Sequence, residues 1–282
     1  NKLVRINAVT FRMKAPPGAA CKDLVMTNRS LLDYSGRSIV FDTETTGFPP
    51  EGATYKEYPA TTKIISFGAV ELMDGVPTGR EWERFFNPGC SSARDALDVH
   101  GITDEFLLNY PAFGEEFISE LYYEIFQVGE GIPVRLYAHK SRFDIDMLLS
   151  EVHRAGYDAD AFIPLMDEID TRTIFRSVYP HFKQYGLDKI QDHLGVTTKR
   201  DKHGALLDTK ILAECMAIAR RDFGAQAIAR LEKDAVLRRS PALPDYGART
   251  PRVLALSAEQ TAGQQVFLES LAGKYPVLVK TA

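Results

Sequence analysis

The stretch Ser38-Ile-Val-Phe-Asp42-Thr-Glu44-Thr-Thr-Gly47 decides the fold of this chain. The apolar run 39–41 is typical of a buried strand, and residues 45–47 predict the turn that ends it. Side chains two positions apart on a strand point to the same face, so Asp42 and Glu44 are expected to present their carboxylates side by side. A solvated strand end would explain this pair, and so would a divalent metal site, because hard cations such as Mg²⁺ prefer carboxylate oxygens.

The composition is that of an ordinary globular protein. With 282 residues, 45% hydrophobic and 26% charged, the chain can form one well-buried domain with appendages or two small domains. The formal net charge of -4 excludes the strongly basic surface that holds a long duplex. If the substrate is a nucleic acid, the protein would therefore bind only a short stretch at the end of the strand, or a partner protein would hold the strand.

The cysteines and the hydropathy indicate the compartment. Cys21, Cys90 and Cys215 are widely spaced and form no Cys-x-x-Cys pair, which favours a reducing compartment and argues against a thiolate zinc site. No apolar run approaches the roughly 18 residues of a membrane span. We expect a soluble, cytoplasmic protein.

The middle of the chain predicts strands followed by helices. Strands at 64–72 and 81–86, joined by the turn Met73-Asp74-Gly75, would form an antiparallel meander with the first strand. A helix over 112–128 follows, then a buried strand at 134–138. Further helices are expected from 143 to 155, from Asp170 or Thr171 to 179, and over 187–194.

Two further acidic positions have alternative interpretations. Asp144 lies where a helix N-cap is expected, and a capping Asp is common. Asp208 follows His203 by five positions, which on one helix would place them roughly 140° apart. The two converge only if His203 precedes Gly204 on a loop while Asp208 lies in the helix that runs to about Phe223. Asp208 shares its turn with apolar residues, and a carboxylate directed toward a core needs a partner such as a metal.

These residues resemble a known family. Asp42-Thr-Glu44-Thr-Thr-Gly, Phe143-Asp144 and His203-Gly-Ala-Leu-Leu-Asp208 resemble, in this order, the motifs of the DEDDh branch of the 3'-5' exonuclease superfamily. More narrowly, Phe86-Asn-Pro-Gly, Val99-His100-Gly-Ile-Thr-Asp-Glu-Phe-Leu and the segment from His203 to Glu214 are similar to the proofreading epsilon subunits of bacterial DNA polymerase III. The resemblance covers about Ser38 to Phe223.

The resemblance implies a fold and a site. The fold would be an α/β, ribonuclease-H-like mixed sheet, with three antiparallel strands and then parallel strands, flanked by helices. Asp42, Glu44 and Asp208 would hold two divalent metal ions, Mg²⁺ or Mn²⁺, about 4 Å apart. Asp144 would complete the carboxylate set through water, and His203 would be the general base. The residues expected to face the terminal nucleotide of a single-stranded or frayed DNA 3' end are Thr45, Thr46, Gly47, His100 and Phe143.

The chain departs from the epsilon pattern at two places. Lys140 stands where the family usually carries an Asn, so a cation there could contact a phosphate or could be solvated. An extension of 37 residues also precedes the first strand. Residues 1–22 carry five Lys or Arg and no acid, as in an organellar presequence, but a trimmed or engineered end explains them as well.

The remaining segments are expected to be a tether and a docking tail. Residues 38–223 would be the exonuclease domain, 224–256 a linker, and 257–282 a helical tail opened by Ser257-Ala-Glu-Gln260. The resemblance implies that this tail docks on the alpha subunit of DNA polymerase III. Gln226-Ala-Ile-Ala-Arg-Leu231 lies where the family carries a sliding-clamp peptide, although an ordinary helix would explain it as well.

Three functions fit the sequence. The first is a proofreading exonuclease tethered to a replicative polymerase. The second is a stand-alone DEDDh exoribonuclease that trims RNA 3' ends. The third is a non-catalytic subunit that stabilises a polymerase complex. A tail after a linker favours the first over the second, and the gathered acids argue against the third.

Overall fold

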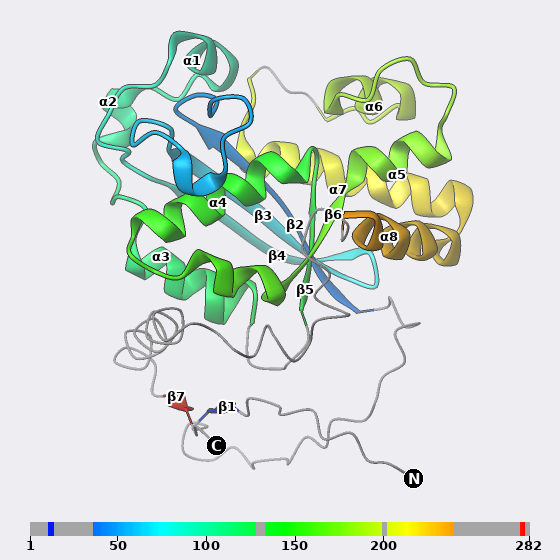
Figure 1. Ribbon diagram of the computed structural model, residues 1–282. Coiled ribbons are helices and arrows are strands. Elements are labelled where there is room, and N and C mark those ends of the chain that lie inside the picture. Colours follow the sequence, from blue (N-terminus) through cyan, green and yellow to red (C-terminus); the bar gives the residue numbers. More distant parts are fainter. Residues whose placement is uncertain (1–10, 14–35, 128–132, 199–201, 240–276, 280–282) are drawn as a thin grey trace.

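The computed structural model describes residues 11–13, 36–127, 133–198, 202–239 and 277–279. Its centre is a five-stranded mixed sheet with the strand order β4-β3-β2-β5-β6 (Figure 1). The strands of this sheet are β2 (Arg37–Thr45), β3 (Ile64–Met73), β4 (Val76–Phe85), β5 (Val134–Ala138) and β6 (Met166–Asp170). The pairs β2–β3 and β3–β4 are antiparallel, whereas β5 is parallel to β2 and to β6. This is the mixed topology that the sequence predicted.

The central strand β2 divides the core into two. Ile39 and Phe41 pack into one hydrophobic cluster, whereas Val40 belongs to the other. Successive side chains of a strand point to opposite faces of the sheet. Asp42 and Glu44 are therefore on the face to which Val40 points.

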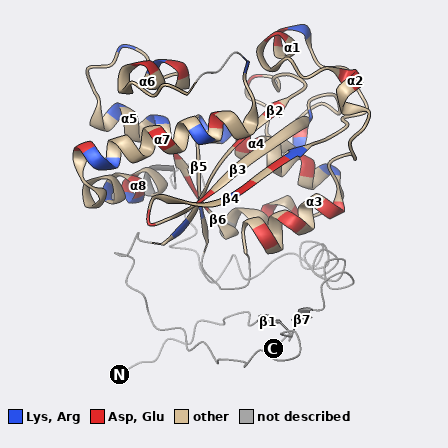
Figure 2. Cartoon of the chain, turned by 180° about the vertical axis from the view of Figure 1, so that it is seen from behind, with Lys and Arg blue, Asp and Glu red and all other residues tan. Residues whose placement is uncertain are grey.

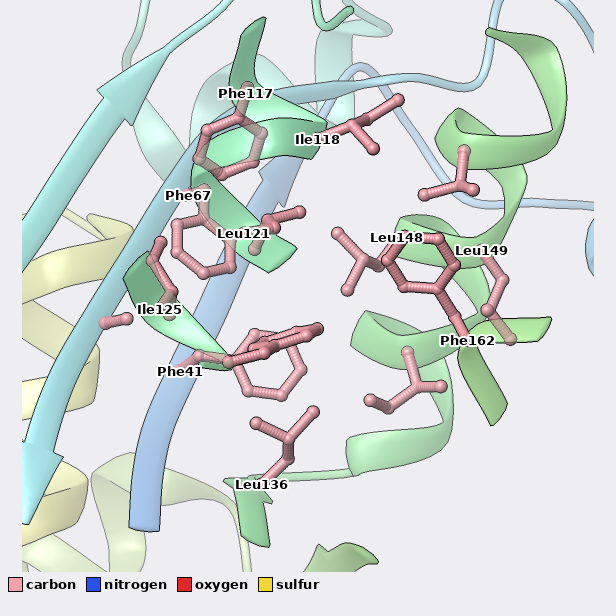
Figure 3. Close-up of a cluster of buried hydrophobic side chains, with 14 of the residues drawn as sticks. Phe41, Phe67, Phe117, Ile118, Leu121, Ile125, Leu136, Leu148, Leu149 and Phe162 are labelled. Atoms are coloured by element: carbon pink, nitrogen blue, oxygen red, sulfur yellow. The ribbon is translucent and has the colours of Figure 1, made fainter. Parts of the chain in front are cut away.

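The first face is covered by four helical segments. They are α3 (Glu115–Glu120), the π-helical turn η2 (Leu121–Ile125), α4 (Ser141–Arg154) and the 3₁₀ helix η3 (Ala159–Leu165). Figure 3 shows side chains from these segments, among them Leu121, Leu148 and Phe162, gathered around Phe41 and Phe67 of the sheet. All five are almost completely buried, and burial of each large apolar side chain contributes roughly 1.5–3 kcal/mol to stability.

The second face is covered by the remaining long helices. They are α5 (Thr171–Val178), α6 (Leu187–Leu194), α7 (Ala205–Phe223) and α8 (Ala225–Arg239). Asp170 caps α5 by accepting a hydrogen bond from the Arg172 backbone N–H at 2.9 Å, as expected from the sequence. Helix α7 packs on β2 and β3, so it crosses the sheet beside the carboxylate pair.

Some elements differ from the sequence prediction. The helix expected over 112–128 begins only at Glu115, because Gly114 before it is extended, and it continues as the π-helical turn η2. Among the elements that were not predicted are α1 (Arg94–His100), α2 (Asp104–Leu107) and strand β6. Three of the five residues of β6 are acidic, and such residues are rare in strands except at an edge, which is where β6 lies.

The expected linker is corrected in its first half. Residues 225–239 form α8, which packs against α5, α7 and β6. Ile228 is completely buried, and Leu231 is partly buried against the second core cluster. The stretch 226–231 is thus one side of a packed helix in this structure, whereas the resemblance implied a clamp-binding peptide there.

Other expectations concern the chain ends. The helix expected from Ser257 lies outside the described residues, as does most of the extension 1–37. The short strand β1 (Phe11–Met13) pairs antiparallel with β7 (Val277–Val279). Among the described residues no helix is both long and apolar enough to span a bilayer.

Candidate active site

The site lies where β2 ends. Asp42 is half-buried and Glu44 is only 8% exposed. Their register partners on β3 are Gly68 and Ser66. Asp42 and Glu44 share a face of β2 with Val40, because residues two positions apart on a strand point to the same side. This is the face that α7 covers.

The start of α7 brings His203 and Asp208 to the same place. Gly204 is the N-cap and the helix begins at Ala205, so His203 precedes the helix and Asp208 lies in its first turn. The His203 Nδ1 atom is 3.2 Å from Asp208 Oδ2. His203 and Asp208 therefore converge, as expected if His203 lies on the loop before Gly204.

Three side chains offer a compact donor set. One atom each of Glu44, His203 and Asp208 lie within 4.8 Å of one another. Two carboxylates and an imidazole are ligands that divalent cations accept, so the donor chemistry fits a metal. Asp42 and Asp144, which were also predicted as ligands, are not in this group.

Gly68 allows α7 to approach the sheet. A Cβ atom at this position would lie 2.1 Å from the backbone N of Leu206 and 2.2 Å from the carbonyl carbon of Ala205. The neighbouring Thr209 hydroxyl donates a hydrogen bond to the Gly68 carbonyl oxygen at 3.2 Å. The first turn of α7, which carries Asp208, therefore rests directly on the backbone of β3.

Asp144 reaches the site from the other face of the sheet. It lies inside the first turn of α4, whose N-cap is Lys140, so the N-cap interpretation of Asp144 is wrong. Asp144 Oδ1 accepts hydrogen bonds from the backbone N–H and the hydroxyl of Thr43, at 3.0 and 2.7 Å. Burial raises the pKa of Asp144 to about 7, although the two Thr43 donors oppose that shift. The Asp144 carboxylate is thus bound to the residue that lies between Asp42 and Glu44 on β2, but it does not join the compact donor set.

His100 lies against the turn that follows β2. It is 4% exposed, and its Nδ1 accepts a hydrogen bond from the Ile102 backbone N–H at 2.9 Å. Burial lowers the pKa of His100, and the positive charge of Lys202 lowers it further, against an opposing hydrogen bond with the Thr45 backbone. A neutral ring that accepts at Nδ1 carries its proton on Nε2.

The turn at 45–47 is fixed by several hydrogen bonds. The Thr45 hydroxyl donates to the Gly47 carbonyl oxygen at 3.0 Å, and the Ala93 N–H donates to the Thr46 carbonyl oxygen at 2.6 Å. Phe48, which comes next, is 73% exposed, and its ring centroid is 5.6 Å from that of Phe143. The exposed Phe48 ring, supported by the partly buried Phe143, can stack on a nucleobase.

Two residues beside the site, Phe48 and Thr43, were not predicted from the sequence. The only sequence signal for Phe48 is its place directly after the turn 45–47. Nothing in the sequence pointed to Thr43, because its role depends on how α4 meets β2.

Comparison with known proteins gives a family match and several relatives. A family model described as "Exonuclease" matches residues 39–216. The chain is 36% identical over 179 residues to the DNA polymerase III subunit epsilon of Pasteurella multocida (strain Pm70), with 63% of this chain and 66% of that protein covered. It is 34% identical to the subunit of the same name from Escherichia coli (strain K12), with 63% and 69% covered. The chain thus spans about two thirds of the length of these relatives.

Solved structures share the fold at low sequence identity. The nuclease domain of 3'hExo, a DEDDh family member bound to rAMP, aligns with a TM-score of 0.54 and 17% identity, covering 69% of this chain and 96% of that one. An E. coli ExoI–ssDNA complex aligns with a TM-score of 0.55 and 17% identity, covering 70% and 42%. The predicted ribonuclease-H-like mixed sheet is confirmed.

Proposed function

This chain belongs to the exonuclease family, and on that premise we propose that it is the proofreading exonuclease of a replicative DNA polymerase. It is a 3'-5' exonuclease, a hydrolase of terminal phosphodiesters. The observation that carries the proposal is the convergence of Glu44, His203 and Asp208 from β2 and the start of α7. The substrate we assign is a single-stranded or frayed DNA 3' end, and the product is a 5'-nucleoside monophosphate.

We assign the metal-holding role to four carboxylates. Asp42, Glu44 and Asp208 would hold two divalent ions, Mg²⁺ or Mn²⁺, with Asp144 supporting them through water. When bound, such ions neutralise the phosphate and the charge that develops on the attacking and leaving oxygens. The closeness of Glu44 and Asp208 in the compact donor set supports this assignment.

His203 acts as the general base in this proposal. Its Nδ1 contacts Asp208, which orients the ring and directs Nε2 toward the attacking water. Nε2 takes a proton from that water as the water oxygen forms its bond to phosphorus and the bond from phosphorus to the 3' oxygen breaks. A positioned base of this kind accounts for roughly 10²- to 10⁴-fold of the rate.

The terminal nucleotide would be held beside the acids. We assign contacts with it to Thr45, Thr46, Gly47, His100 and Phe143, and we add Phe48. The buried His100 supports the turn through its hydrogen bond with the Thr45 backbone, and the rings of Phe48 and Phe143 offer apolar surface to the base. The hydrogen bonds within the turn support this role because they fix its shape before substrate arrives.

The polymerase is the partner that the relatives suggest. Those relatives are named as subunits of DNA polymerase III, and we assign docking to residues 240–282, which follow the nuclease domain in the chain. A tether of this kind would compensate for the mildly acidic charge of the chain, since the partner would hold the DNA. Binding of a sliding clamp through 226–231 would require α8 to detach.

The test is hydrolysis of one oligonucleotide made as DNA and as RNA, each with and without a chelator. We expect monophosphate release from a 3'-mismatched DNA primer that stops with chelator and falls by at least about 10²-fold in Asp208→Asn. The matched control is Asp74→Asn, which removes an acid from the exposed β3–β4 turn. Undiminished activity in Asp208→Asn would contradict the metal assignment, and faster cleavage of RNA would replace the DNA substrate with an RNA end.

A further inference from the structure

Three exposed cations near the site have no acidic partner. Lys140, Arg176 and Lys183 make no ion pair within the described part of the chain, and all three are exposed. Other exposed cations are neutralised, such as Arg84 by Glu120 and Lys210 by Glu81. Lys140 follows β5, and Arg176 and Lys183 follow β6, the neighbouring strand of the sheet, so the three can serve one anionic ligand.

Lys140 is fixed at the edge of the sheet where the site lies. It follows the end of β5, which is parallel to β2, and it precedes Asp144 by one helical turn. Its backbone is left-handed, with φ 69° and ψ 45°, and its N–H donates to Asp170 Oδ1 at 3.2 Å. This backbone conformation costs an ordinary L-residue roughly 1 kcal/mol, so the lysine is present despite a local penalty.

Arg176 and Lys183 are joined to the same edge through Tyr185. The carbonyl oxygen of Tyr185 is 2.7 Å from His139 Nε2, directly beside Lys140 in the chain. The Arg176 guanidinium lies over the Tyr185 ring, with its carbon 5.5 Å from the ring centroid. This stacking orients the guanidinium while its N–H donors face solvent.

The segment that carries these cations contains no acids. Residues 171–187 include three Lys or Arg and no Asp or Glu. Helix α5 accordingly shows blue and no red in Figure 2. Figure 1 shows α5 beside the segment that leads to α6, next to the ends of β5 and β6.

We propose that Lys140, Arg176 and Lys183, here called the upstream edge, bind the sugar-phosphate backbone of a single strand on the 5' side of the scissile bond. The proposal rests on the nuclease function proposed above. A 3' end has no nucleotide beyond the terminal one, so any backbone that leaves the site belongs to upstream nucleotides. Exposed cations without carboxylate partners are available to phosphates, and binding releases counterions.

The test compares a 15-nucleotide single strand with a dinucleotide, which has one phosphodiester and no upstream backbone. The double variant Arg176→Gln/Lys183→Gln should lose roughly tenfold in kcat/KM on the 15-mer and keep its kcat/KM on the dinucleotide. The slope of log affinity for the 15-mer against log salt, measured by fluorescence anisotropy with chelator, should become shallower by about 1.4, at about 0.7 per phosphate contact.

The matched control is Arg84→Gln/Lys210→Gln, which removes the same two charges at the opposite sheet edge, where both side chains accompany β4. This control should retain the wild-type slope. If the upstream-edge variant and the control have equal slopes, the inference is wrong. Because binding is read without hydrolysis, a chain that binds as expected but cleaves neither substrate would contradict the proposed function alone.

A second variant separates binding from folding. Asn is the L-residue that best tolerates a left-handed backbone, so Lys140→Asn should be at least as stable as the wild type. It should nonetheless bind the 15-mer severalfold more weakly. Unchanged binding together with a raised Tm would show that Lys140 is only a solvated lysine, which would remove it from the upstream edge.

Discussion

At the scale of single residues, the site depends on a position with no side chain. Gly68 lets the first turn of α7 lie on β3, where a Cβ would meet the Leu206 backbone at 2.1 Å. Gly68→Ala should therefore displace the turn that carries Asp208. We expect a loss of roughly 1–3 kcal/mol of stability and a fall in kcat, read by urea denaturation and by monophosphate release.

The control for this change is Gly186→Ala. Gly186 caps α6 with φ -69°, and a Cβ there would meet nothing within 4 Å. The substitution Gly186→Ala should change neither stability nor activity appreciably. If Gly68→Ala were equally harmless, the close approach of α7 would not be what positions Asp208.

Asp144 gives a prediction about pH. Burial raises the pKa of Asp144 to about 7 from 3.8, so between these values the folded chain binds more protons than the unfolded chain. The stability contribution of Asp144 is then greatest below about pH 4 and is lost as pH rises to about 7. With chelator at pH 7.5, the free energy of unfolding of Asp144→Asn should be roughly 2–4 kcal/mol larger than that of the wild type, at about 1.4 kcal/mol per pKa unit.

The measurement is the free energy of unfolding of both proteins from pH 4 to 7.5. Asn can still accept both hydrogen bonds from Thr43, so the substitution removes the charge and little else. Parallel curves across this range would contradict the pKa shift.

The residues of the site differ in how far the sequence predicts them. The shared face of Asp42 and Glu44 can be predicted from the two-residue period of a strand. The convergence of His203 with Asp208 can be predicted from the position at which one helix begins. The roles of Gly68 and Thr43 cannot be predicted from the sequence, because each residue contacts an element that is distant in the chain. Local periodicity fixes which face a side chain takes, but not what packs against it.

At the scale of elements, α8 belongs to the nuclease domain. Glu232 is buried and forms an ion pair of 2.6 Å with Arg220 of α7, and burial is the largest influence on Glu232, raising its pKa. Removal of α8 would leave Arg220 without this partner and would expose the apolar residues around Ile228. Removing one partner of a largely buried ion pair costs about 3–5 kcal/mol.

Two truncations test this assignment. Deletion from Ala225 should destabilise the domain by at least about 3 kcal/mol in urea denaturation. Deletion from Ser240 should leave stability and nuclease activity unchanged and should abolish co-elution with the polymerase. Equal stability of the two truncated chains would contradict the packing of α8, and co-elution that survives the second would place polymerase docking elsewhere.

Two of the elements that were not predicted, β6 and α8, have identifiable physical causes. The acidic β6 is a strand only because β5 offers it an edge, and α8 was obscured by Gly224, whose φ of 85° ends α7 one residue before α8 begins. The meander, β5 and helices α4 to α7 were predicted because their periodicity and their end signals are local.

At the scale of the whole molecule, the fold brings together Glu44 and Asp208, two acids that are 164 positions apart in the chain. Their mutual repulsion disfavours this arrangement unless cations lie among them. The mixed sheet provides the geometry, because β2 carries one pair, α4 presents Asp144 from one face, and α7 presents Asp208 from the other.

The most direct test of this central claim is calorimetric titration of Mn²⁺ into the wild-type protein and into Asp42→Asn and Asp208→Asn. The account predicts saturable uptake of up to two ions by the wild type and loss of at least one of them, or an affinity at least about tenfold lower, in each variant. Identical uptake by all three proteins would contradict it.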